Sequence, residues 1–191
     1  SLSTTQIQAL AVKNIAALST YQVSQLRTEQ LVALSLQQIK ALETQDMAVL
    51  SANQIKALST SAMAVLSGAQ ISSLNTNAVA ALNSLQIASI STQGIVALST
   101  VQIAVLWDEA LQSLTTSQVS KLNTQQIAGL STHQIQIIHP NQIRALSGVQ
   151  IAAIESQDVA IMTTLQIQAM SPALPTSLTA AQISALTTVQ V

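Results

Sequence analysis

The sequence has no cysteine, few aromatic residues and few charges, and each absence narrows what the chain can be. Without cysteine there are no disulfides, no thiolate nucleophile and no cysteine metal ligands. Charged residues make up 7% of the 191 residues, against about 25% in a typical soluble domain, and the formal net charge is -1. This charge balance argues against nucleic acid or anionic lipid as partners. It also weakens repulsion between copies, so self-association is expected.

Long hydrophobic runs are also missing. Ser, Thr and Gln interrupt the sequence so often that no apolar run reaches the roughly 18 residues of a membrane-spanning helix. The only aromatic residues are Tyr21 and Trp107, so the 49% hydrophobic content is mostly alanine, leucine, isoleucine and valine. We therefore expect no membrane span and a core of small, similar side chains.

A leucine-class residue does recur at every eighth position, from Leu2 to Leu186. Around it the chain repeats an octad of the form Ser-Thr-x-Gln-Ile-x-Ala-Leu, as in residues 3–10. A short perfect repeat indicates one local structure stacked on itself many times. The sequence therefore predicts a single repeat solenoid over residues 1–191.

Each octad carries the signals of a very short helix. Ser3 and Gln6 have the spacing of a capping box, and Ile7 and Leu10 share one helix face. One continuous helix is excluded, because eight residues turn a helix about 80° beyond two full turns and the apolar stripe would wrap around it. We predict an all-α solenoid. A β-solenoid is the alternative, but the capping box and the presence of only four glycines favour helices.

Alternate octads keep their glutamine strictly, whereas the octads between them do not. This alternation predicts a 16-residue coil with two octad helices, about twelve coils, and the strict octads along one wall. At the usual helix spacing of roughly 8–10 Å such a rod is about 100–120 Å long. The strict glutamines are expected either to cap their own helices only or also to form a ladder along the rod. They are Gln6, Gln22, Gln38, Gln54, Gln70, Gln86, Gln102, Gln118, Gln134, Gln150, Gln166 and Gln182.

Two octads depart from the pattern. Residues 107–114 place Trp107 at a cap position, which suggests a contact point for a partner or a tolerated surface substitution. Residues 171–178 place Pro175 where the core isoleucine belongs, and proline cannot donate a helix hydrogen bond. We expect an irregular coil at 171–178.

Catalytic and metal-binding patterns are weak. His133 and His139 are the only histidines and lack a third ligand nearby. No serine has a recognisable His–Asp partnership, and no glycine-rich phosphate loop exists. We therefore expect no enzyme activity, no cofactor and no bound metal.

Two carboxylate pairs raise the possibility of calcium. Glu43 with Asp46, and Glu155 with Asp158, repeat the same spacing of three residues. Calcium normally takes six or more oxygens in a shaped loop, whereas these pairs occupy the two capping-box positions. The sequence favours a capping role for both.

The octads resemble repeat tracts of very large proteins of Gram-negative bacteria, which are secreted or displayed on the cell surface, some by type I secretion. The resemblance extends from residues 3–7 to residues 179–183. It implies an extracellular or cell-surface location, and the family offers no catalytic residues.

These features together predict a structural protein. We expect a stiff extracellular rod or fibre that extends by end-to-end self-assembly, since Leu2 and Val191 lie in repeat phase. The alternative is a binding scaffold or adhesin segment that recognises a protein, glycan or ice surface. A row of exposed aromatic or charged residues would favour binding, and the chain has no such row.

Overall fold

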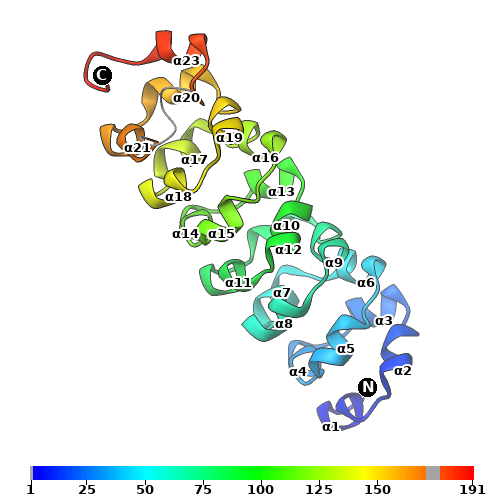
Figure 1. The fold of residues 1–191 in the computed structure, drawn as a ribbon. Coiled ribbons are helices and arrows are strands. Elements are labelled where there is room, and N and C mark those ends of the chain that lie inside the picture. The colour runs from blue at the N-terminus through cyan, green and yellow to red at the C-terminus, as the bar shows by residue number, and fades with distance from the viewer. Residues whose placement is uncertain (1, 171–176) are drawn as a thin grey trace.

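The structure, a computed structural model, describes residues 2–170 and 177–191. In these ranges every regular element is a short helix, and none is a strand. The helices stack into an elongated solenoid with the two termini at opposite ends (Figure 1). The predicted all-α solenoid with one short helix per octad is confirmed.

The described residues contain 22 helices of four to six residues each. They are α1 (Thr4–Gln8), α2 (Val12–Ala16), α3 (Thr20–Ser24), α4 (Thr28–Val32), α5 (Leu36–Lys40), α6 (Thr44–Val49), α7 (Ala52–Ala57), α8 (Thr60–Val65), α9 (Gly68–Ser72), α10 (Thr76–Ala80), α11 (Ser84–Ser89), α12 (Thr92–Ala97), α13 (Thr100–Ala104), α14 (Asp108–Gln112), α15 (Thr116–Val119), α16 (Thr124–Ala128), α17 (Thr132–Ile137), α18 (Pro140–Arg144), α19 (Gly148–Ala152), α20 (Ser156–Ile161), α21 (Thr164–Ala169) and α23 (Ala180–Ala185).

Most described helices begin at a capping residue, and nearly all end without a glycine, Gly129 after α16 being an exception. The backbone N–H of Gln22 donates to the Ser19 hydroxyl, and the Gln22 Oε1 atom accepts from the Ser19 N–H at 2.9 Å. At many corners two extended residues follow one another, as at Leu58 (φ -65°, ψ 136°) and Ser59 (φ -70°, ψ 160°). No described residue has a positive φ, so these corners have no need of glycine.

Helices pack on the helix three places along the chain. Helix α7 contacts α4 and α10, and the same step recurs from one end of the described chain to the other. A coil therefore contains three octads, about 24 residues, and the expected two-octad coil of 16 residues is wrong. A corner of two extended residues does not reverse the chain as a tight turn does, so three helices complete a coil.

Two further expectations change with the coil size. The chain holds about eight coils rather than twelve, and at the usual helix spacing the rod is roughly 65–80 Å long. Strict and loose octads alternate along the chain, and each octad stacks on the octad three places away. A strict octad therefore always stacks on loose octads, and the two kinds alternate along every face. The strict octad of α7, for example, lies between the loose octads of α4 and α10, so no wall consists of strict octads alone.

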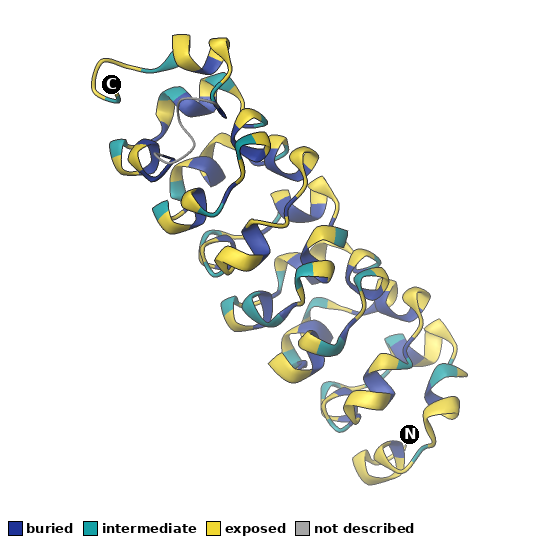
Figure 2. Cartoon of the chain, viewed as in Figure 1, coloured by how far each residue is buried: buried dark blue, intermediate teal, exposed yellow. Residues whose placement is uncertain are grey.

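The core runs along the axis of the solenoid. The residue after the glutamine position and the leucine-class residue are buried in most described octads, as Ile55, Leu58 and Ile87 show, whereas Ile183 near the C-terminal end is exposed. Figure 2 shows this pattern, with buried residues on the inner surfaces of the helices and exposed residues outside. No octad can bury its apolar face alone, so stability comes from contact with the coils on either side.

Two glycines bring one pair of helices together. A methyl group on Gly94 of α12 would lie 2.6 Å from the Ile90 Cγ2 atom and 3.3 Å from the Ile71 Cγ1 atom. A methyl group on Gly68 of α9 would lie 3.2 Å from the Gln93 carbonyl oxygen. Helices α9 and α12 share the most extensive contact between described helices, because neither carries a side chain at these points. Residues 171–176, most of the octad expected to be irregular, lie outside the described residues.

Candidate functional site

The most developed polar site is a glutamine that links neighbouring coils. The Gln118 Oε1 atom accepts from the Thr115 N–H at 2.7 Å, which completes the capping box of α15. Its Nε2 atom donates to the carbonyl oxygens of Ile87 at 2.9 Å and Ile90 at 2.7 Å in the preceding coil. The residue is only 2% exposed. One side chain therefore both starts its own helix and joins two coils.

The same bridge is repeated along the solenoid. In each case Nε2 donates to backbone carbonyls between 28 and 31 residues earlier in the chain. The bridging residues are Gln30, Gln38, Gln54, Gln70, Gln86, Gln102, Gln118, Gln126, Gln134, Gln142, Gln150, Gln166, Gln182 and Gln190.

The bridge includes residues outside the strict set. Gln30, Gln126 and Gln142 belong to loose octads and bridge in the same way. Within the strict set, the first-coil residues Gln6 and Gln22 make only capping-box bonds in the structure. The link runs from side chain to backbone, and no hydrogen bond joins two of these glutamines in the described residues.

One octad without glutamine places another donor at the same carbonyls. In α10 the glutamine position is Ala78, and the N-cap is Asn75. The Asn75 Nδ2 atom donates to the carbonyl oxygens of Ala48 and Leu50, each at 3.0 Å. These acceptors lie 30 and 28 residues before position 78. A glutamine at position 78 would donate to the same carbonyl oxygens. Asn75 therefore supplies the missing bridge, a role that the sequence analysis did not identify.

Trp107 supplies the bridge in a second such octad. The glutamine position of α14 is Ala110, and the Trp107 Nε1 atom donates to the Leu82 carbonyl oxygen at 2.8 Å. Leu82 again lies 28 residues before the glutamine position. The side chain remains 41% exposed, so part of the ring faces solvent. The indole thus links two coils, and contact with a partner remains a prediction.

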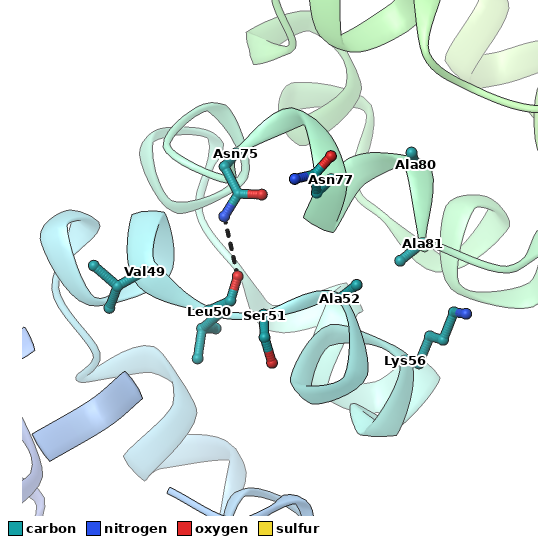
Figure 3. Close-up of a pocket in the computed structure, with 9 residues that line it drawn as sticks. All are labelled: Val49, Leu50, Ser51, Ala52, Lys56, Asn75, Asn77, Ala80 and Ala81. Carbon is teal, nitrogen blue, oxygen red and sulfur yellow. Dashed lines mark hydrogen bonds between the residues drawn. The ribbon is translucent and has the colours of Figure 1, made fainter. Parts of the chain in front are cut away.

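A surface groove lies beside the Asn75 bridge to Leu50. It has a volume of about 650 Å³ between α7 and α10, where the lining includes Lys56, Asn77 and Ala80 (Figure 3). A neighbouring hollow shares Lys56 and Ala80 and extends to Trp107. We call the two together the Lys56 trough. Both parts are wide open, which suits surface contact better than enclosure of a small substrate.

The two histidines are not brought together. The His133 Nε2 atom lies 3.0 Å from Asp108 Oδ1, which forms the one ion pair among the described residues, and both side chains are largely exposed. His139 caps α18, where its Nδ1 atom accepts from the Asn141 N–H at 3.2 Å. The ion pair joins α14 to α17 and adds little stability, as exposed pairs generally do.

The two carboxylate pairs differ from one another. The Asp46 Oδ2 atom accepts from the Glu43 N–H at 3.0 Å, as expected of a capping box. No such bond joins Asp158 to Glu155, although Asp158 is buried. The capping role expected of both pairs is therefore present only in the first.

Comparison with known proteins supports the repeat assignment. Residues 39–76, about a fifth of the chain, match the model of the ALTTAQ repeat. No curated protein matches the chain. Among the described helices, none combines the length and apolar character needed to cross a membrane. The chain is thus a repeat protein, similar over this segment to ALTTAQ repeats.

Proposed function

We propose that the chain is a non-catalytic structural rod. The observation that carries the proposal is the buried glutamine bridge, which ties successive coils together along the described solenoid. Each bridge satisfies a helix start and backbone carbonyls at once, and unmaking it would leave buried polar groups without partners. A rod linked in this way resists bending and separation of its coils.

We further propose that copies stack end to end. At the first coil, Gln6 and Gln22 make only their capping bonds in the structure, and Leu10 and Leu18 are only partly buried. At the other end Val189 is exposed. A second copy at either end would continue the stacking that already joins coils within the chain. Contact between two different ends does not close on itself and extends into a filament.

The proposed location is the outside of a bacterial cell. It rests on the resemblance of the octads to repeats of large secreted and cell-surface proteins. A cysteine-free chain that is held together by packing and buried hydrogen bonds is compatible with that setting.

Electron microscopy of the purified chain across a concentration series tests the proposal. We expect filaments one solenoid wide that lengthen with concentration. The double substitution Gln6→Glu with Gln22→Glu should shorten them, because it places two negative charges at the end where copies meet. Isolated rods at every concentration would contradict end-to-end assembly, and compact or flexible particles would contradict the rod itself.

A binding scaffold is the second candidate, and the Lys56 trough favours it. The trough combines an ammonium group, amide groups and part of an indole ring on one surface. Trp107 is the only tryptophan, so its fluorescence should change when a ligand occupies the trough. Screening glycans and peptides by this signal, with Lys56→Ala as the comparison, tests the candidate. A response that Lys56→Ala leaves unchanged would place the ligand elsewhere.

A further inference from the structure

We propose that Asp158 marks a buried site for a hard cation of the calcium class, held between two coils. Asp158 occupies the glutamine position of the octad that forms α20 and is only 4% exposed. Its Oδ1 atom is buried and has no hydrogen-bond partner. A buried carboxylate without a partner is costly unless something neutralises or coordinates it.

The surrounding residues supply no positive charge. Residues 145–191 contain no lysine, arginine or histidine, and Glu155 in the same octad adds a second carboxylate. Helix α20 packs against α17 and α23. The only charged or titratable side chain on these two helices is His133 of α17, whose Nε2 atom is bonded to Asp108. An ion pair within the protein therefore does not balance Asp158.

The repeat register identifies what Asp158 faces. In the preceding octad Gln150 donates to the carbonyls of Val119 and Leu122, which lie 31 and 28 residues earlier. The same offsets from Asp158 lead to the carbonyls of Ile127 and Leu130. A glutamine presents N–H donors to these oxygens, whereas a carboxylate presents only acceptors. In this register a carboxylate takes the place of the donor opposite the carbonyl oxygens, and a cation that bridges them would satisfy both.

The spacing leaves room for that bridging group. Aspartate is shorter than glutamine by one methylene, roughly 1.5 Å of chain. Carboxylate and backbone carbonyl oxygens are the ligands that calcium uses, at about 2.3–2.6 Å, with waters completing six or more positions. Among the described residues no three acidic or histidine side chains form a metal cluster, so the backbone carbonyls are essential to this site.

Asp46 provides a matched contrast. It occupies the same position in its own octad and is equally buried. Its Oδ2 atom accepts from the Glu43 N–H at 3.0 Å, so its carboxylate already serves the helix start. We therefore assign the cation to Asp158 and not to Asp46.

Calcium titration of the chelator-treated chain, by calorimetry and by thermal unfolding, tests the proposal. Asp158→Gln restores the repeat residue and should fold. Wild type and Asp46→Gln should bind calcium at Asp158, with a rise of several degrees in unfolding temperature, whereas Asp158→Gln should lose one site per chain. Magnesium, which demands a tighter octahedral site, should have a much smaller effect.

Three outcomes would overturn the assignment. Wild type that shows no calcium binding would do so. Binding that is unchanged in Asp158→Gln would place the cation elsewhere. Stabilisation of wild type by acid, with no response to calcium, would show that a proton rather than a cation occupies the corner.

Discussion

At the scale of single residues, a buried glutamine stabilises this chain in two ways at once. Its carbonyl oxygen accepts from the N-cap N–H, and its amide hydrogens reach carbonyls of the preceding coil, as in Gln118. The capping half was predictable from the Ser-x-x-Gln spacing. The bridging half was not, because its acceptors lie 28 to 31 residues away and leave no local pattern. The only hint in the sequence is that a glutamine whose side-chain carbonyl oxygen caps a helix still has two amide hydrogens to donate.

The first prediction compares one isosteric substitution at two octads. Gln118→Glu should destabilise the protein by at least about 3 kcal/mol, because a buried carboxylate would face backbone carbonyls. Gln22→Glu should change stability by less than about 0.5 kcal/mol, since Gln22 makes only capping bonds and an acidic residue suits a helix start. Urea unfolding measures both. Equal costs at the two positions would show that bridging adds nothing to capping.

The second prediction concerns Trp107. Trp107→Phe keeps the ring but removes the donor to the Leu82 carbonyl, so it should cost about 1–2 kcal/mol in unfolding free energy. Replacing the octad by its consensus, Trp107→Ser with Ala110→Gln, should recover most of this loss. If the double variant is as unstable as Trp107→Phe, the indole does not stand in for a glutamine.

At the scale of elements, the octad signals predicted the helices but not how many complete a coil. Capping residues and apolar spacing act within eight residues, so one helix per octad could be inferred. The number of octads per coil depends on how far each corner turns the chain. The 16-residue alternation in the sequence is not the structural period, since helices stack every third octad.

The closest helix pair gives the third prediction. Gly94→Ala adds helix propensity of about 1 kcal/mol but places a methyl group 2.6 Å from Ile90 Cγ2, just before α12, and 3.3 Å from Ile71 Cγ1 of α9. Overpacking costs about 1–3 kcal/mol, so we expect a net loss of stability in thermal unfolding. Gly148→Ala, whose methyl group would meet mainly the Ser177 hydroxyl side chain, should cost less. A more stable Gly94→Ala protein would contradict the crowding of Gly94 by Ile90 and Ile71.

At the scale of the whole molecule, the chain is a sum of similar coils. Contacts between described helices join one coil to the next, so stability should accumulate from neighbouring coils rather than from one central core. Three octads per coil also set the length, and the rod is shorter than the sequence alternation suggested.

Cross-linking of cysteine pairs tests the three-octad coil most directly, since the natural chain has no cysteine. Lys56→Cys with Ala80→Cys joins positions three octads apart that line the same groove. Lys56→Cys with Ser72→Cys joins positions two octads apart. A short cross-linker should couple the first pair efficiently and the second pair hardly at all. Efficient coupling of the second pair without the first would establish a two-octad coil and contradict the fold described.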